Sequence, residues 1–579
     1  RLYLDRVRDR QRDFTVNAEN AGAIAEICLR LDGIPLAIEL IAVQNISLSP
    51  AQLVRKMESR LDLLVDGPRD LPDRLRTMRN AIAWSYDLLT SDERSLAMRV
   101  SIFADGMSED AVSRLTRTLG NDSSSVPALL SSLVEKNLLR LDTLPDPPRY
   151  RMLETIREYG IEQLHALQEH DRTRAAHYTV YSALLVDVDA ELIGEHQVWW
   201  YDWVQTEHQN IRLAIEHAID HRQGHIAMEM ASAIWRFWST RGYCVDGLRW
   251  LERALALDAG PVTTARARAL RSAGRLAEDL TNYEKAETYQ RQALAAWTEL
   301  EDSSGTAIAY DDLGSLAHNR GEFDRADQLH LESLKLSREA KNTRIMMSAL
   351  SNLGASAWRR GDHERAFEYF TQAREIATDP LSIALMTANR GVAAMGLGRV
   401  EDALAFAEES LRLWKQNGSK RGVADALLNL ADPKQRLGDL DEARRNAGEA
   451  LAIYEEIGEQ YGTLSALHTL AVTARLGEAF EASLELLRRG LAIVQEVDDR
   501  PSAAMFLDNF ALDFFALGQL DASTAALAAA DEVRIAFDAR RGFFEHREYQ
   551  MLLDRLSIDP ETLRAQSPSI DELILELLA

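Results

Sequence analysis

Small residues recur along most of the chain at a regular spacing of about 40 residues. Around each of them, apolar residues follow the three- and four-residue spacing of amphipathic helices, so each repeat reads as two helices. Small residues allow two helices to cross closely. The pattern therefore predicts stacked helix–turn–helix units. The spaced small residues are Ala254, Ala293, Ser333, Ala373, Ser410, Ala450, Gly490 and Ala530.

A second small residue precedes each of these by seven positions, and in most units a glycine lies five residues earlier still, where it would end the first helix. In the unit of Ser483 the glycine is Gly477, six residues earlier, which predicts a longer turn there. One helix pair cannot bury its apolar face alone, so neighbouring units must stack. The array resembles tetratricopeptide repeats in a form of about 40 residues. The predicted turn glycines are Gly242, Gly321, Gly361, Gly398, Gly438 and Gly518.

Residues 1–160 lack this period. Residues 1–76 predict several helices: an amphipathic start, Ala21–Cys28, and a helix that begins at Pro35, a residue suited to a first helical turn. Residues 77–160 predict a winged helix, in which two strands flank a proline-rich turn. Its predicted helices are Met78–Leu89, Asp92–Phe103, Ser108–Leu119 and Val126–Lys136, and its strands are Leu138–Asp142 and Arg149–Leu153.

The chain therefore predicts an all-α organisation. Its parts are a helical subdomain over residues 1–76, a winged helix over 77–160, a helical junction over 161–225, repeats over 226–540 and capping helices over 541–579. At 579 residues, the chain is too long for a single core. It opens at Arg1 directly in a helical pattern, so we interpret it as a fragment or a processed piece.

Charge is distributed unevenly along the chain. The net charge is −25, yet the segment 1–160 carries 22 Lys and Arg against 24 Asp and Glu, so the acidity belongs to the repeats. Such a surface repels phosphate backbones. It is either a solvated face that keeps a long array soluble or a surface for a cationic partner. The two cysteines, Cys28 and Cys244, predict no disulfide framework, and no apolar run is long enough to span a bilayer. We expect a cytoplasmic protein with no membrane partner.

Three motifs in the segment 1–160 suggest a family. They are Gly33–Leu40, Trp84–Leu89 and Tyr150–Tyr159. In this order and spacing they resemble the C-terminal part of the NB-ARC module of the signal-transduction ATPases with numerous domains (STAND). The resemblance is greatest to bacterial transcription regulators, LuxR-like or antibiotic-regulator-like, that join NB-ARC to tetratricopeptide repeats. It extends to a stretch that often bridges switch and repeats in that family, with Trp203, Glu207, Asn210, Arg212 and Ala214.

The resemblance implies an ATP or ADP site. It places Gly33, Pro35 and Leu36 against the adenine, and Leu153 and Glu154 where the winged helix senses the diphosphate. Without the resemblance, Gly33 and Pro35 read equally well as an ordinary loop-to-helix junction. The sensing histidine of the family falls at Leu153, which cannot donate a hydrogen bond to phosphate.

No Gly-Lys-Ser or Gly-Lys-Thr occurs, so the phosphate-gripping loop and its Mg²⁺ ligand are missing from this sequence. We expect no ATP hydrolysis by this chain alone. ATP or ADP, with Mg²⁺, would be held in the parent protein through an upstream nucleotide-binding domain.

Other side chains that could bind a metal, a ligand or DNA are better explained by structural roles. His217 and His221 stand one helical turn apart, but no third zinc ligand follows with supporting spacing. A cluster of tryptophans predicts a core at the junction rather than a ligand cage. An arginine-rich segment suggests DNA binding, but interleaved aspartates dilute its charge. The tryptophans are Trp199, Trp200, Trp203, Trp235, Trp238 and Trp250; the arginines are Arg69, Arg74, Arg76 and Arg79.

The leading hypothesis is the regulatory and sensor portion of a nucleotide-switched signalling protein. As the resemblance implies, ADP would hold the switch closed. A protein, peptide or small-molecule signal on the repeats would then favour ATP, opening and self-association. DNA would be reached only through another domain. A stand-alone scaffold that binds a partner without nucleotide switching is the alternative, and a truncated fragment with no independent biology is a third possibility.

Overall fold

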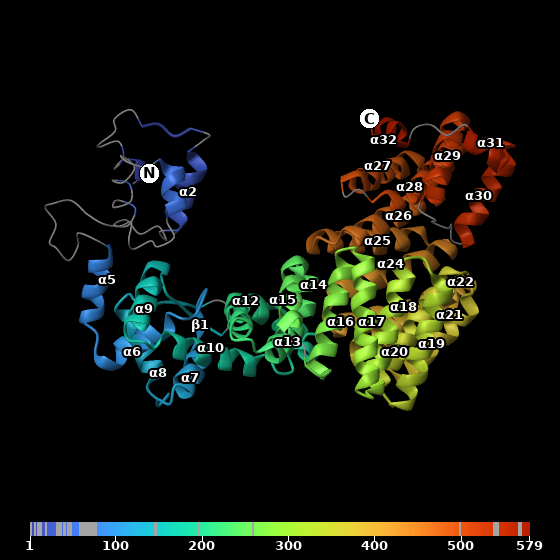
Figure 1. Cartoon of the computed structure of the whole chain (residues 1–579). Helices are drawn as coiled ribbons and strands as arrows, with labels where there is room; N and C mark the ends of the chain where they lie inside the picture. The colour runs from blue at the N-terminus through green and yellow to red at the C-terminus, as the bar shows by residue number, and fades with distance from the viewer. Residues whose placement is uncertain are drawn as a thin grey trace. The chain divides into compact units, whose positions relative to one another are not determined.

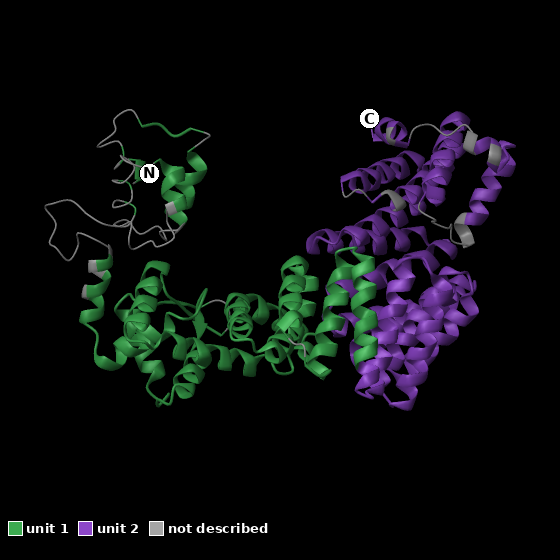
Figure 2. Ribbon diagram, viewed as in Figure 1, with its two compact units in different colours: residues 1–296 green, residues 297–579 purple. Residues whose placement is uncertain are grey.

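The chain folds into two compact units, Arg1–Ala296 and Trp297–Ala579, coloured separately in Figure 2. The structure is a computed structural model. It describes residues 3–4, 7, 14–17, 20–30, 38, 42, 49–56, 78–143, 147–194, 196–257, 260–496, 499–536, 543–565 and 570–578. The described residues are predominantly helical, as the sequence predicts (Figure 1).

The first described helices of unit 1 are α2 (Ala21–Arg30) and α4 (Pro50–Lys56), which contact each other. α2 confirms the predicted helix Ala21–Cys28 and extends two residues beyond it. The predicted adenine contacts Gly33, Pro35 and Leu36 lie outside the described residues, as do Arg69, Arg74 and Arg76.

A small antiparallel sheet lies among the helices that follow. Its strand order is β1 (Met107–Ser108), β3 (Arg149–Arg151), β2 (Arg140–Asp142), with Tyr150 paired to Met107 on one side and to Leu141 on the other. The four predicted helices and both predicted strands of this segment are confirmed to within a few residues. β1 was missed, because two residues are too short to show strand alternation. The helices are α5 (Met78–Asp87), α6 (Ser91–Val100), α7 (Glu109–Thr118) and α8 (Val126–Glu135).

The rest of unit 1 is helical, and α17 runs across the boundary into unit 2. The tryptophan core is confirmed in part: Trp235, Trp238 and Trp250 are buried, whereas Trp199 is 48% exposed. The helices are α9 (Glu154–Ala166), α10 (His170–Leu184), α11 (Val188–Glu191), α12 (Gln197–Asp220), α13 (Gly224–Ala233), α14 (Trp235–Thr240), α15 (Cys244–Leu257), α16 (Thr264–Asp279) and α17 (Tyr283–Glu299).

Unit 2 consists of paired antiparallel helices. We call the even-numbered helices α18 to α28 first helices and the odd-numbered α19 to α29 second helices. The helices are α18 (Ser303–Asn319), α19 (Phe323–Glu339), α20 (Thr343–Arg359), α21 (His363–Ile376), α22 (Pro380–Gly396), α23 (Val400–Gln416), α24 (Lys420–Arg436), α25 (Leu440–Ile457), α26 (Gln460–Leu476), α27 (Phe480–Glu496), α28 (Arg500–Ala516), α29 (Leu520–Ala536), α30 (Phe543–Leu556), α31 (Pro560–Ala565) and α32 (Ile570–Leu578).

Every first helix of unit 2 begins with a side-chain cap. In α18, for example, the Asp302 carboxylate accepts a hydrogen bond from the Gly305 amide, at 2.8 Å. Such a cap satisfies an amide that has no partner inside the helix. These caps repeat with the period of the array and could have been found in the sequence. The cap residues are Asp302, Asn342, Asp379, Ser419, Glu459 and Asp499.

The turns within the pairs are short, and the predicted glycines Gly321, Gly361, Gly398, Gly438 and Gly518 have φ between 72° and 81°. The longer turn predicted before Ser483 is wrong. α26 ends at Leu476 and α27 begins at Phe480, the same interval as between α28 and α29. Glu478 takes the left-handed position there, with φ of 57°, so a non-glycine residue replaces the glycine without lengthening the turn.

Successive first helices of unit 2 contact each other directly, from α18–α20 through to α26–α28, whereas the described second helices of neighbouring pairs do not approach as closely. The array therefore curves with its first helices on the inner side. The helix spacing continues past α29, since α27, α29 and α31 begin at equal intervals, at Phe480, Leu520 and Pro560. α32 then packs on α27 and α29.

Candidate functional site

The two predicted diphosphate-sensing residues lie at the start of α9. Leu153 is the N-cap residue and is 39% exposed, and α9 has no side-chain cap because leucine has no acceptor. Glu154 accepts two hydrogen bonds from Arg157, from Nε at 2.8 Å and from Nη2 at 2.6 Å. Both residues therefore lie at one helix start, and their contact with a diphosphate stays a prediction.

A buried polar cluster joins this segment to α12, and we call it the junction network. It consists of Arg149 on β3, His177 and Tyr181 on α10, and Glu207 and Asn210 on α12. Each of these side chains is at most 4% exposed. They come from three elements that are well separated in sequence, so the network can form only in the folded chain.

Glu207 is the centre of the network. Its Oε1 atom accepts a hydrogen bond from Arg149 Nη1 and forms an ion pair with that guanidinium. Its Oε2 atom accepts from the Tyr181 hydroxyl at 2.6 Å and from Asn210 Nδ2 at 2.9 Å. The carboxylate is thus fully used, which is what a buried charge requires.

Asn210 extends the network to the backbone beside β1. Its Nδ2 donates to the Gly106 carbonyl at 3.0 Å, and its Oδ1 accepts from the Ala104 amide at 2.8 Å. Arg149 Nη2 also donates to the Gly106 carbonyl, at 3.0 Å. Gly106 has φ of 95°, and a Cβ there would lie 2.8 Å from the Tyr150 carbonyl oxygen. Only glycine therefore fits this turn.

Burial sets the protonation states around the network. It is the main cause that lowers the pKa of His177 to about 4, so this imidazole is neutral at neutral pH. Since Asn210 Oδ1 is an acceptor, His177 Nε2, 3.4 Å away, is the donor in their contact. Burial, followed by the neighbouring Glu207, raises the pKa of the Tyr181 hydroxyl well above its usual value, so Tyr181 remains a donor.

The sequence identified part of this network. Glu207 and Asn210 belong to the bridging stretch that carries the family resemblance, and Ala214 from that stretch is buried. Trp203 stacks edge-to-face on Trp200, and Arg212 donates to Gln209. Arg149, His177 and Tyr181 were missed, because nothing in the spacing of the sequence pairs residue 149 with residue 207.

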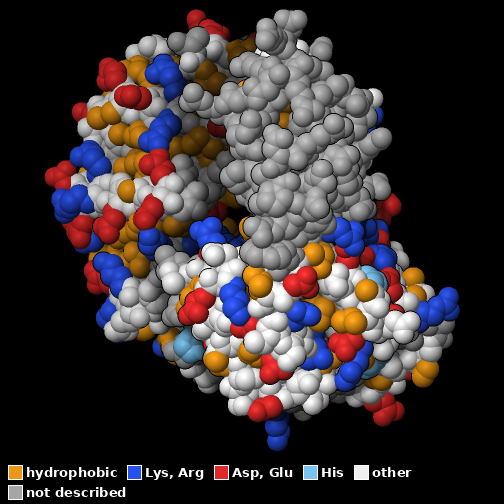
Figure 3. Space-filling view, turned by 90° about the vertical axis from the view of Figure 1, so that its left-hand side faces the viewer, with side chains coloured by type: hydrophobic (Ala, Val, Ile, Leu, Met, Phe, Trp, Pro, Cys, Tyr) orange, Lys and Arg blue, Asp and Glu red, His pale blue; other side chains and the backbone are white. Residues whose placement is uncertain are grey.

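The remaining predicted constellations have structural surroundings. The His217 and His221 rings lie 4.0 Å apart, and no group of three metal-ligating side chains occurs among the described residues. Arg79 forms an ion pair with Glu162 at 2.8 Å. In Figure 3, acidic and basic side chains are interspersed over the described part of the face shown. None of the described helices has the length and apolar character needed to span a membrane.

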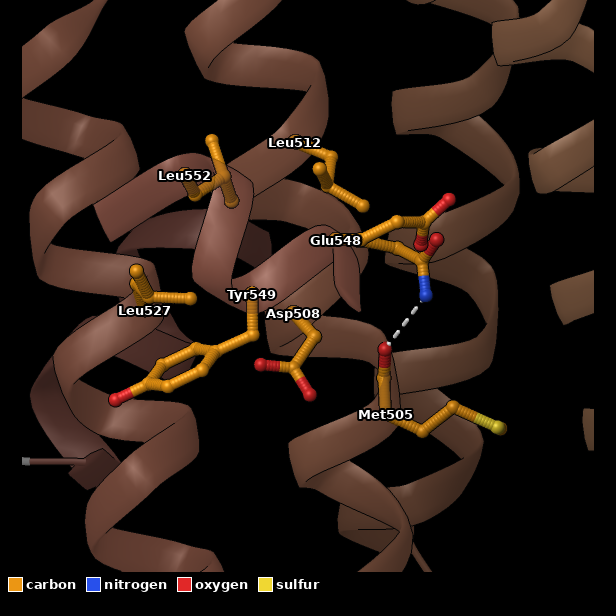
Figure 4. Close-up of a pocket in the computed structure, with 8 residues that line it drawn as sticks. Met505, Asp508, Leu512, Leu527, Glu548, Tyr549 and Leu552 are labelled. Carbon is orange, nitrogen blue, oxygen red and sulfur yellow. Dashed lines mark hydrogen bonds between the residues drawn. The ribbon is translucent and has the colours of Figure 1, made fainter. Parts of the chain in front are cut away.

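A small cavity lies between α28, α29 and α30 (Figure 4). Its volume is about 10 Å³, and its lining includes Asp508, Leu527 and Tyr549. A cavity of this size holds about one water molecule. The Tyr549 hydroxyl donates to Asp531 at 2.8 Å, so the polar groups here are used within the fold. The cavity is a packing feature and not a ligand site.

Comparison with known proteins agrees with this architecture. The tetratricopeptide repeat family model matches residues 265–339, 305–379, 382–456 and 422–496. The crystal structure of a Signal Transduction ATPase with Numerous Domains (STAND) protein with a tetratricopeptide repeat sensor, from Pyrococcus horikoshii, has a TM-score of 0.53 and 15% identity. The likeness covers 93% of this chain and 74% of that one.

Two mycobacterial relatives match parts of the sequence. A "Putative HTH-type transcriptional regulator" of Mycobacterium tuberculosis is 36% identical over 256 residues, 44% of this chain. An "Uncharacterized protein" of the same species is 32% identical over 183 residues, which is 30% of this chain and 44% of that protein. The match spans 29% of the length of the regulator.

These findings define the class of protein. The chain contains tetratricopeptide repeats over residues 265–496 and has the fold of a STAND protein with a repeat sensor. Its relatives include a protein named as a transcription regulator. The predicted resemblance is confirmed at this level.

Proposed function

We propose that this chain is the regulatory and sensor portion of an ATP/ADP-switched signalling protein that controls transcription. The observation that carries the proposal is the junction network, in which buried Glu207 and Asn210 on α12 hold β3 and the β1 turn. α12 is the helical connection that leads toward the repeats. A ligand that moves the repeats would therefore act on the small-sheet segment through a buried contact with many hydrogen bonds.

In this proposal the segment 77–160 is the winged helix of the switch. The order of elements, α6-β1-α7-α8-β2-β3 with an antiparallel sheet, supports this assignment. α8 takes the place of the DNA-reading helix, but its exposed residues are Pro127, Ala128, Ser131 and Glu135. None of these is basic, and an arginine or amide that could read bases is absent from its exposed face. The segment therefore regulates, and DNA is reached through another domain.

Leu153 and Glu154 would face the nucleotide with Gly33, Pro35 and Leu36, while the phosphate loop and Mg²⁺ come from an upstream domain. The N-terminus of α9 suits a phosphate because the positive end of a helix dipole attracts anions, whereas Glu154 would repel it unless Arg157 neutralises the carboxylate. That pairing is consistent with a sensor position that contributes little binding energy of its own.

Nucleotide retention tests this proposal. We would purify the complete product of the encoding gene and the 1–579 chain, release bound nucleotide with acid and quantify it by chromatography. We expect ADP on the complete product, at close to one per chain, and none on the 1–579 chain. A complete product without nucleotide, and without a Gly-Lys-Ser or Gly-Lys-Thr loop, would contradict the switch.

The second candidate is a scaffold that binds a partner on its repeats without switching. The curved array of unit 2, with first helices on its inner side, favours this function because such arrays present extended binding surfaces. Partner binding that is unchanged by ATP or ADP in the complete product would support the scaffold over the switch.

A further inference from the structure

Second helices of unit 2 pack against the following first helix through three positions. The first position is the residue directly after the regularly spaced small residue of the second helix. The other two positions lie three residues apart on the first helix of the following pair. We call each such contact between a second helix and the following first helix a joint. In four of the joints, all three positions are apolar and are buried or partly buried. The sets are Leu334, Leu350 and Leu353; Leu411, Leu427 and Leu430; Leu451, Leu467 and Leu470; and Leu491, Leu507 and Phe510.

The joint between α21 and α22 departs from this pattern at all three positions, which are Arg374, Thr387 and Arg390. Arg374 Nε donates to the Thr387 hydroxyl at 3.2 Å. The repeat is also shorter here, because α21 has 14 residues where α19 and α23 have 17. A polar, cationic joint therefore interrupts an otherwise apolar array.

The positive charges of these two arginines are poorly compensated by neighbouring groups. Arg374 Nη2 lies 4.0 Å from the Glu409 carboxylate. Arg390 forms no hydrogen bond or ion pair with any described residue, and its Nε atom is buried. Its guanidinium carbon lies 4.3 Å from the ring centre of Phe406 and 5.6 Å from that of Phe367. Arg390 as a whole is partly exposed, and these cation–π contacts offset only part of the cost of its partial burial.

The positive charge of Arg390 is only partly balanced by its surroundings. Burial, and then the neighbouring Arg374, lower the pKa of Arg390, against the opposing effect of Glu409 and Glu375. Leucines at these positions would pack without that cost, as they do in the other joints. A buried polar group without a partner often marks the place of a missing ion or ligand. Two guanidinium groups that are near enough to affect each other electrostatically suit an oxyanion, which can bond to both.

We propose that the joint between α21 and α22 binds an oxyanion, the phosphate or carboxylate group of a ligand, between Arg374 and Arg390. The anion would displace Glu409 from its long contact with Arg374. Phe367 and Phe406 would hold the Arg390 guanidinium in place for it. The anion site is inferred from the contacts within the joint and does not depend on the proposed function. The further step, that the bound anion belongs to the signal molecule, rests on the proposed sensor function of the repeats.

Thermal unfolding of the 1–579 chain tests the site, with inorganic phosphate and succinate as probes and sodium chloride holding the ionic strength constant. We expect at least one probe to raise the melting temperature saturably, by about 3 to 5 °C at roughly 100 times its Kd. Phosphate alone would indicate a phosphorylated ligand, and succinate alone a carboxylic acid. Arg390→Leu should raise the melting temperature without anion and abolish the anion effect.

Arg365→Leu is the control, because Arg365 is an exposed arginine on α21, the helix that carries Arg374. It should keep the full anion effect. Should Arg390→Leu fold poorly, Arg390→Lys retains the charge but loses the planar fork, and calorimetry should show at least about five-fold weaker binding of the active probe. Equal stabilisation of the wild type and Arg390→Leu, or no anion effect on the wild type, would overturn the site. Neither result bears on nucleotide retention by the complete product.

Discussion

Asp513 on α28 is a carboxylic acid inside the apolar core of the last repeats. It is fully buried, and neither carboxylate oxygen has a hydrogen-bond partner. Burial raises its pKa to about 6, against the weaker opposing effects of Ser483 and Arg475. The folded state therefore favours the protonated acid, and the cost of the charge grows as the pH rises from the unfolded pKa near 4 to the folded pKa near 6.

Replacing Asp513 by asparagine should accordingly stabilise the protein at high pH. We expect Asp513→Asn to gain about 1 to 3 kcal/mol in free energy of unfolding at pH 8 and less at pH 5. Urea unfolding at both pH values measures the difference. Asp521→Asn, at an exposed position of α29, is the control and should change little at either pH. A loss of stability at both pH values would show that the carboxylate has a partner.

The ion pair of Arg149 and Glu207 permits a second test of single residues. Either partner alone would be a buried, unpaired charge, so Arg149→Met and Glu207→Gln should each cost about 3 to 5 kcal/mol. The double variant should cost at least about 1.5 kcal/mol less than their sum. Urea unfolding of the wild type, the two single variants and the double variant gives the four free energies of unfolding that this comparison needs. Arg249→Met, from an exposed pair with Asp246, should cost under about 0.5 kcal/mol. Additive single effects would mean that the two residues do not interact.

At the scale of helices and turns, the tight turn between α26 and α27 is the informative exception. Glu478 occupies a left-handed position that neighbouring units give to glycine, and its side chain is exposed. Glu478→Gly should raise the free energy of unfolding by about 0.5 to 1 kcal/mol, whereas Gly438→Ala, at the matching turn, should lower it by about 1 kcal/mol. Urea unfolding of both variants measures these changes. A loss of stability in Glu478→Gly would reveal a contact made by the glutamate.

Elements with a strong period were predictable. The helix pairs, their glycine turns and the helices from Met78 to Glu135 follow from apolar spacing and turn residues. β1 was not predictable, because a two-residue strand has no period. The length of the turn before Ser483 was predicted wrongly, because a non-glycine residue can take a left-handed backbone conformation at a modest cost in free energy. The polar joint at Arg374 and Arg390 can be read from the sequence only after the structure shows which positions face each other.

The whole chain carries a net charge of −25. We therefore expect no measurable binding of a 30-base-pair DNA duplex by the 1–579 chain at about 150 mM salt, with a Kd weaker than roughly 10⁻⁴ M. Fluorescence anisotropy of labelled DNA measures this. Saturable binding at low micromolar protein would contradict both this expectation and the regulatory role proposed for the winged-helix segment 77–160.

The sequence by itself determined the helical class, the period of the array, the tetratricopeptide resemblance and the residues Glu207 and Asn210. Each of these depends on local spacing, which a single chain records directly. The tertiary structure alone decided that Arg149, His177 and Tyr181 meet those two residues in one buried network. It also decided that Arg374 and Arg390 share one joint. Contacts between residues far apart in sequence arise from packing, and packing leaves no period in the chain.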